Sequence, residues 1–413
     1  MRLPLRGERA RAGGDPGSGP MPPRHSGPGE SGESNQSGES ENSNRSGESG
    51  NSGRSAPGHA TGRGSRVSWS LSRQTRTSLI TLLLVLLVVI AGTLYHPAYV
   101  ILRAGPAVDT LGETGGHNLV SISGVPTYPT TGSLDFTTVA QYGGPGYDIT
   151  VWDLLVARLD PRAQIIPRDQ LYPPNATADQ VRQQTSAQMQ GSQNAAAAVA
   201  LRAVGKPEEA VVAQVAPNGP AVGHLQEGDV VTAVGGTRVQ AAADVSRLVQ
   251  AAGDSVRMSV RRSGSTLDVD VPTRVIDGRR MVGVGLEARF DDSITVTIDA
   301  GNVGWPSAGM MFALAVYDKI TPGPLTGGQK IAGTGTIGLD GAVGPIGGIA
   351  HKMVGARDAG AAWFLAPAAD CPEVVGNVPD GLHVARVATF DEARTAVEAI
   401  GAGRGQSLPT CTG

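Results

Sequence analysis

The sequence predicts an α/β domain near the C-terminal end, preceded by a small β-barrel domain with helices and by a single transmembrane helix. Three features of the 413 residues support this fold class. Thr77 to Tyr95 form an uncharged apolar run, residues 206–275 alternate short strands with Gly-rich turns, and residues 280–403 alternate strands with helices. A chain of this length has room for two or three domains.

The first segment, residues 1–76, is not expected to fold by itself. Its stretch SGESNQSGESENSNRSGESGNSGRS has no apolar periodicity, so it cannot bury enough apolar surface to offset the entropy lost on ordering. We expect a disordered low-complexity tail without chemistry of its own. The formal net charge of −3 gives no indication of a general nucleic-acid binder, so no nucleic-acid partner is expected.

Residues 77–97 are predicted to anchor the chain in the cell membrane. At about 1.5 Å of rise per residue, the apolar run is long enough to cross the hydrocarbon core of a bilayer. A buried helix of a soluble domain is the alternative. Arg63, Arg66, Arg73 and Arg76 lie shortly before the run and Arg103 alone follows it closely. The positive-inside rule therefore places the tail in the cytoplasm and the later domains outside. The leader is too long for a cleaved signal peptide, which favours one uncleaved, single-pass anchor.

Residues 104–205 are predicted to be an extracytoplasmic connector. NLVSISG indicates a strand, and GYDITVWDLLVARL indicates a strand that passes into a helix. A long helix follows and ends at Gly205, a plausible C-cap. No catalytic constellation was found in this stretch, so we expect it to pack between the membrane and the later domains.

Residues 206–275 combine short strands with Gly-rich turns. The strand AVVAQV is followed by a turn, a small helix, a Gly-Asp turn, the amphipathic helix AADVSRLVQAA and a hairpin. This pattern resembles a PDZ domain, and the residues that carry the resemblance are Gly219, Pro220, Ala221, Leu225, Gly228, Asp229, Val234, Gly235 and Gly236. PDZ domains bind extended peptides by adding a strand to a sheet edge. The stretch GKPEEAVVAQV, where the carboxylate-binding loop is expected, departs from the usual Gly-Leu-Gly-Phe form, and a purely structural module is the alternative.

Residues 280–403 are predicted to form an α/β domain with its own core. MVGVGLEARF and ITVTIDAG are predicted strands, and a helix follows over 307–319. A Gly-rich, hairpin-like stretch leads to the helix IAHKMVGARDAG, and AAWFLAP, HVARVAT and FDEARTAVEAI complete the alternation. The two cysteines, Cys371 and Cys411, would pair in an oxidising compartment and otherwise stay free, and the sequence leaves both possibilities open.

Ser307 and Lys352 are the candidates for chemistry in this domain. A serine hydroxyl is a poor nucleophile without a base, and a lysine can be that base only if its pKa falls from about 10.4 towards 7 or 8. Burial has this effect, and the neighbours of Lys352 are mostly small and apolar, with His351 turned away from the face of Ile349 and Met353. N–H groups at the helix start could hold an oxyanion. A helix-capping serine and a solvated lysine are the alternatives.

Three sequence motifs favour the catalytic roles over these alternatives: PSAG at a predicted helix start, GTGTI in a predicted strand and DGAVGPIGGIAHK leading into a predicted helix. Together they resemble the proteolytic domain of the Lon family of serine proteases. The order of anchor, connector, PDZ and Lon-type domain is similar to that of the membrane-anchored, PDZ-containing Lon-like proteases of bacteria. The resemblance implies that Ser307 is the nucleophile, Lys352 the general base and Thr334 a hydrogen-bonding partner near the lysine. A plain strand threonine is the alternative for Thr334.

Two residues depart from the family pattern, and other site patterns are missing. Trp305 stands where relatives usually carry glycine, and Gly304 where ATP-dependent members often carry an acidic residue. The chain has no G-x-x-x-x-G-K-[ST] string, so we expect activity without ATP, with no cofactor and no metal. The stretch GTGTIG matches a dinucleotide-binding pattern, but the residues after it cannot open a helix. No H-E-x-x-H string supports a zinc protease.

The predicted function is that of an ATP-independent serine endopeptidase with a Ser-Lys dyad. It would cleave protein or peptide substrates outside the cytoplasmic membrane, with substrate binding by the PDZ domain. The alternative is a catalytically silent membrane-anchored PDZ scaffold that binds partner proteins, which the bulky ring of Trp305 favours. Lon-type domains commonly assemble as rings, so the resemblance implies a homo-oligomer such as a hexamer.

Overall fold

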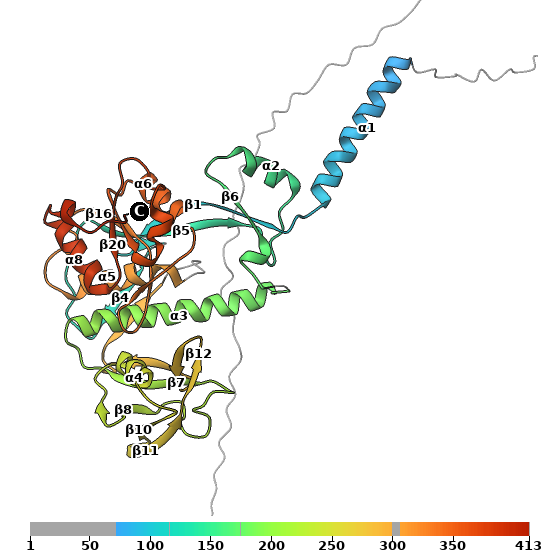
Figure 1. Ribbon diagram of the computed structural model, residues 1–413. Coiled ribbons are helices and arrows are strands. Elements are labelled where there is room, and N and C mark those ends of the chain that lie inside the picture. Colours follow the sequence, from blue (N-terminus) through green and yellow to red (C-terminus); the bar gives the residue numbers. More distant parts are fainter. Residues whose placement is uncertain (1–71, 115, 174, 300–305, 413) are drawn as a thin grey trace, which may run out of the picture. The chain divides into compact units, whose positions relative to one another are not determined.

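A computed structural model describes residues 72–114, 116–173, 175–299 and 306–412 (Figure 1). The predicted tail up to residue 71, together with Gly304 and Trp305, therefore lies outside the described residues. The described residues belong to one compact unit, Leu71–Gly413.

Helix α1, Arg73–Leu94, contains the apolar run, and the Ser72 side chain caps its start. None of its residues is buried, and its most apolar stretch has a mean hydropathy of 2.6. Trp152 of helix α2, Val151–Leu159, donates a hydrogen bond to the Val89 carbonyl of α1. The helix is long and apolar enough to cross a membrane, as the sequence predicted.

A six-stranded sheet forms the centre of the α/β domain, in the order β20-β19-β16-β5-β1-β6. Strands β16, β19 and β20 run parallel to one another and to β5, whereas β1 runs antiparallel to β5 and β6. The strands are β1 Tyr99–Asp109, β5 Ser133–Tyr142, β6 Gln164–Pro167, β16 Lys330–Gly333, β19 Trp363–Pro367 and β20 His383–Val387.

Half of this sheet comes from the segment that was predicted to be a connector over residues 104–205. Strand β5 pairs with β16 along the register from Ser133 opposite Lys330 to Phe136 opposite Gly333. The connector prediction is therefore corrected: this segment builds the α/β domain together with residues after 306. The strand predicted just before α2 is also absent, because Thr150 instead caps α2 in a capping box with Asp153.

Helices cover both faces of the sheet, because successive strand residues point to opposite sides. Ile331 of β16 belongs to the core that contains α3, α5 and α8, whereas the next residue, Ala332, belongs to the core that contains α6. The helices are α3 Ala178–Ala203, α5 Gly309–Ile320, α6 Ile349–Asp358 and α8 Phe390–Gly401. The two cores hold the sheet between helices on either side.

A second sheet, in the order β11-β10-β8-β7-β14, forms the predicted PDZ domain with its own core and helix α4, Ala242–Gln250. Strand β14 had been predicted as part of the α/β domain, but it pairs with β7, and its Leu286 and Ala288 pack on the PDZ core. The strands are β7 Glu209–Val215, β8 Val230–Val234, β10 Ser255–Arg262, β11 Ser265–Pro272 and β14 Val284–Arg289, with β9 Thr237–Arg238 beside β8.

Short strand pairs and turns complete the described elements. Four antiparallel pairs join β2 Glu113–Thr114 to β3 His117–Asn118, β4 Val120–Ser123 to β15 Thr295–Ile298, β12 Arg274–Ile276 to β13 Arg279–Met281, and β17 Thr336–Ile337 to β18 Val343–Gly344. The short helices are η1 Arg168–Gln170, η2 Pro306–Ala308, η3 Ala368–Asp370, α7 Cys371–Val374 and η4 Gly405–Ser407.

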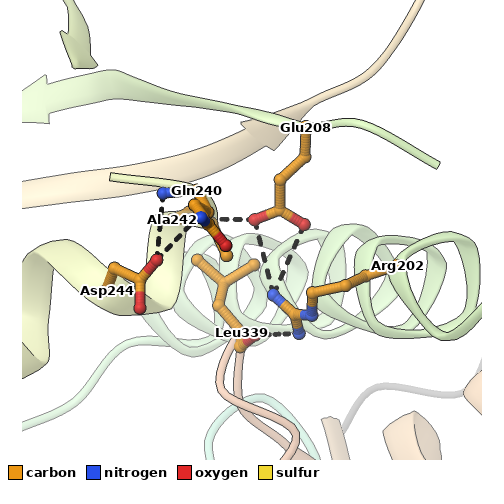
Figure 2. A network of polar contacts seen from close by, with 7 residues as sticks. Arg202, Glu208, Gln240, Ala242, Asp244 and Leu339 are labelled. Atoms are coloured by element: carbon orange, nitrogen blue, oxygen red, sulfur yellow. Dashed lines mark hydrogen bonds and ion pairs between the residues drawn. The ribbon is translucent and has the colours of Figure 1, made fainter. Parts of the chain in front are cut away.

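A polar network joins α3, the PDZ helix α4 and the turn between β17 and β18 (Figure 2). The Glu208 side chain is 1% exposed, accepts a hydrogen bond of 2.6 Å from the Ala242 N–H and lies 3.4 Å from the Arg202 guanidinium. Arg202 also donates to the Leu339 carbonyl, and Leu339 packs against the cores of both domains. The network satisfies a buried carboxylate and connects the PDZ domain to the β17–β18 hairpin.

Cys371 and Cys411 form a disulfide, which settles the question that the sequence left open. Cys411 also packs against the core that contains α6. The bond therefore ties α7 to the C-terminal segment on the α6 face of the sheet.

Candidate active site

Ser307 lies in the turn η2, directly before α5. Its backbone carbonyl accepts hydrogen bonds from the Gly335 N–H at 2.8 Å and from the Thr334 hydroxyl at 3.0 Å. Ala308 is the N-cap of α5 and makes no side-chain capping bond, so Ser307 does not serve as the N-cap of this helix. The backbone of Ser307 is fixed while its hydroxyl is available for other contacts.

Lys352 meets that hydroxyl from the first turn of α6. Its Nζ lies 2.7 Å from Ser307 Oγ and 2.8 Å from Thr334 Oγ1. The structure thus brings together the three residues that the sequence singled out, although 45 residues separate Ser307 from Lys352. His351 points elsewhere, as expected, and its Nε2 lies 3.2 Å from the Gln164 Oε1 of β6.

The position of α6 depends on two glycines. At Gly355 a Cβ atom would lie 2.5 Å from the Gly105 carbonyl oxygen, so only glycine lets the helix pack this closely against β1. Gly348 forms the N-cap with a φ of 69°, a left-handed conformation that favours glycine. These contacts place Lys352 against the sheet.

Burial makes Lys352 a candidate base. The residue is 3% exposed, and its pKa falls from 10.5 to about 8 because burial penalises the ammonium, while the nearby Asp370 carboxylate raises the pKa. Asp370 was not singled out from the sequence. It lies in η3 after β19, on a different element from Ser307 and Lys352, and no local pattern marks it.

Ser307 and Lys352 line a cleft of about 900 Å³. Strands β1 and β5 contribute apolar side chains to it, among them Val108 and Phe136. The segment predicted to be a connector therefore builds part of the cleft wall, which sequence analysis missed. Neither β1 nor β5 was predicted as a strand; the apolar residues Leu134 and Phe136, two positions apart in β5, were an available signal, but they indicate a strand and not its partner. Among the described residues, no group of three or more His, Cys, Asp or Glu side chains could hold a metal ion.

A buried lysine amine at hydrogen-bond distance from a serine hydroxyl in a cleft is the arrangement of a serine peptidase. Residues 278–397 match the family described as the Lon protease (S16) C-terminal proteolytic domain, and residues 180–273 match the PDZ domain family. The chain therefore carries a PDZ domain and a Lon-type serine peptidase domain, as the sequence predicted.

Relatives with similar sequences are themselves named Lon proteases. Lon protease 1 of Sorangium cellulosum is 39% identical over 108 residues, which cover 25% of this chain and 13% of that protein. Lon protease 2 of Bacillus subtilis is 27% identical over 191 residues, which cover 45% of this chain and 32% of that protein. The chain spans a third or less of the length of these two curated relatives, so the match concerns the shared domains.

Solved structures of PDZ domains are also similar to part of the chain. The PDZ domain of the SdrC-like protein from Listeria monocytogenes is 22% identical, and the match covers 19% of this chain and 85% of that one. Its TM-score of 0.18 is too low to carry an argument.

Proposed function

We propose that the chain is an endopeptidase in which Ser307 is the nucleophile and Lys352 the general base. The observation that carries this proposal is the distance of 2.7 Å between Lys352 Nζ and Ser307 Oγ, combined with a pKa of about 8 for the lysine. With this pKa, roughly a quarter of the amine is neutral at pH 7.5. The pKa of such a base lies close to the pH at which it must work.

The proposed reaction follows from the geometry. The neutral Lys352 amine takes the proton from Ser307 Oγ, which attacks the carbonyl carbon of the scissile peptide. The N-terminal turn of α5, which begins two residues after Ser307, provides N–H groups and a partial positive charge that favour the oxyanion. The ammonium of Lys352 then protonates the leaving amine, and water hydrolyses the acyl-enzyme with Lys352 again as the base. Thr334 holds the lysine amine and the Ser307 backbone together.

Cleavage is proposed to need no ATP. The support is the sequence, which has no G-x-x-x-x-G-K-[ST] string to cradle a nucleotide phosphate. Degradation of β-casein by the full chain, in detergent and without nucleotide, should equal degradation with added ATP. Cleavage that requires ATP would contradict the proposal.

The PDZ domain is proposed to bind extended segments of substrates along strand β14. The sequence predicts the peptide-binding stretch around β7, but β7 lies between β8 and β14 and has no free edge. Strand β14 lies at the end of the sheet order, and Gly283 directly before it starts the Gly-Val-Gly-Leu stretch that ends at Leu286. This stretch is similar to the Gly-Leu-Gly-Phe form that was expected before β7. An edge strand can pair with an added strand from a peptide.

The chain is proposed to sit in the cell membrane with its tail inside and its peptidase domain outside. Helix α1 supports the anchor, and the arginines before it support the orientation. Next to α1, helix α2 exposes Leu155, Val156 and Leu159, an apolar group suited to a membrane interface. Protease protection of the tail in sealed vesicles tests the orientation.

A homo-oligomer is proposed from the resemblance alone, and native mass spectrometry of the full chain tests it.

Cleavage of β-casein by matched variants tests the enzyme against the silent scaffold. Ser307→Ala and Lys352→Ala should each lower the rate roughly 10³-fold or more, because neither half of the dyad works alone. Ser186→Ala, on an exposed part of α3, is the control and should leave the rate unchanged. A rate that none of the three substitutions changes would eliminate the dyad, and a fully inactive wild type would favour the scaffold.

A further inference from the structure

Asp370 is a buried carboxylate that the mechanism above does not use. It ends η3, directly after β19, and is 8% exposed. Its two oxygens lie 3.1 and 3.4 Å from the Ile346 backbone nitrogen, whose N–H donates to them. Ile346 lines the cleft and stands two residues before Gly348, the N-cap of α6. The carboxylate therefore holds the segment that leads into the helix of Lys352.

Asp370 also stands out among the charged groups around Lys352. Helix α6 packs against β1, β5, α7 and β19. The titratable or charged side chains on these elements and on α6 are Tyr99, Arg103, Asp109, Asp135, Tyr142, Glu373, His351, Arg357 and Asp358. Arg103 pairs with Asp160, Asp135 with Lys330, and Arg357 with Asp358. Asp370 is the carboxylate whose charge opposes the effect of burial on Lys352.

Covalent and packing contacts fix this carboxylate in place. The next residue, Cys371, is bonded to Cys411, which packs on the core that contains α6. Burial raises the pKa of Asp370, the Ile346 N–H lowers it, Glu373 raises it and Lys352 lowers it. The charge of Asp370 is thus coupled to the lysine in both directions.

We propose that Asp370 is a positioning residue that sets the pH range in which Lys352 acts as a base. Burial favours the neutral amine, and a fixed negative charge nearby favours the ammonium. The balance lets Lys352 take the Ser307 proton and afterwards return it to the leaving group. The catalytic consequence rests on the proposed function, whereas the electrostatic coupling does not.

The coupling can be measured without catalysis, because the sequence contains only four lysines, Lys206, Lys319, Lys330 and Lys352. Lysine labelled with ¹³C at Cε is incorporated into the full chain in detergent, and each resonance is titrated with pH. The Lys352→Met variant assigns the resonance by its disappearance. In Asp370→Asn, which keeps the size and an oxygen for the Ile346 N–H, the Lys352 midpoint should fall by roughly one pH unit. Asp358→Asn, a carboxylate change at the end of the same helix, is the matched control and should leave the midpoint in place.

Each result decides the proposal. A fall of the midpoint in Asp370→Asn, with Asp358→Asn unchanged, supports it. An unchanged or higher midpoint in Asp370→Asn overturns it, as does an equal fall in the control. Thermal unfolding verifies that each variant is folded, and Asp370→Ser provides a second uncharged variant for which the same fall is required.

The pH dependence of kcat/KM gives a second readout that a purely structural role would not move. The acidic limb should move to lower pH in Asp370→Asn by the same amount as the resonance. If the resonance moves but the wild type has no peptidase activity, the coupling stands and the proposed function fails. If the wild type is active but the resonance stays in place, the inference about Asp370 fails and the proposed function stands.

Discussion

Replacing Lys352 by methionine should stabilise the folded protein at neutral pH while it abolishes catalysis. Burial lowers the pKa of Lys352 from 10.5 to about 8, so the ammonium is disfavoured in the folded protein. This difference corresponds to about 3 kcal/mol of unfolding free energy. Methionine has a similar length and no charge, so we expect a gain of about 2–3 kcal/mol at pH 7.

The stability gained by Lys352→Met should decrease as the pH rises. At pH 7 and below the lysine is largely protonated in both states, and the wild type carries nearly the full cost. Between pH 8 and 10.5 the unfolded chain binds more protons than the folded one, so the unfolding free energy of the wild type rises with pH. Above that window neither state binds the proton, and the difference between wild type and variant should vanish.

Thermal unfolding of the full chain in detergent, at pH 7 and at pH 10, measures this effect. A gain of this size should raise the Tm of Lys352→Met by about 5–10 °C at pH 7 and by much less at pH 10. Lys206→Met, a change at a lysine outside the site, is the control and should leave Tm within about 2 °C at both values. A lower Tm for Lys352→Met at pH 7, or a difference that does not depend on pH, would refute the reasoning.

Three further predictions concern contacts of the described residues. Thr334→Val should lower kcat/KM roughly 10–100-fold because it removes an acceptor for the lysine amine, whereas Thr334→Ser should stay within about threefold, and equal losses in both would contradict this role. Replacing Cys371 and Cys411 by serine opens a 40-residue loop and should lower the unfolding free energy by about 4 kcal/mol relative to the oxidised wild type in a denaturant titration, whereas the reduced wild type should match the variant. Arg202→Ala leaves the buried Glu208 without its ion pair and should cost about 2–4 kcal/mol in the same titration, and a neutral effect would argue against the network.

The residues of the candidate site could be predicted because their signals are local. Ser307 follows a proline at a helix start, Thr334 lies in a Gly-rich stretch between β16 and β17, and Lys352 lies among small apolar residues. None of these residues indicates a catalytic site when it is taken alone, and only the three motifs together resemble a Lon-type domain. The distance between the lysine amine and the serine hydroxyl, however, depends on how α6 packs against β1, which no local pattern gives.

The arrangement of the strands could not be predicted for the same reason. No strand was predicted over β1 or β5, and pairing β5 with β16 joins residues about 200 positions apart in the chain. Strand β14 also looked like the start of the α/β domain because it comes next along the chain, yet its side chains fit the PDZ core. Asp370 could not be predicted because its role depends on Lys352, which lies on another helix.

The most direct test of the dyad is the labelling of the full chain by a fluorophosphonate, followed by intact mass measurement and peptide mapping. The wild type should be modified once, at Ser307, at a rate that rises with pH through about 8 as Lys352 loses its proton. Lys352→Met should react far more slowly at every pH. Labelling of Lys352→Met at the wild-type rate, or modification of a residue other than Ser307, would contradict the account.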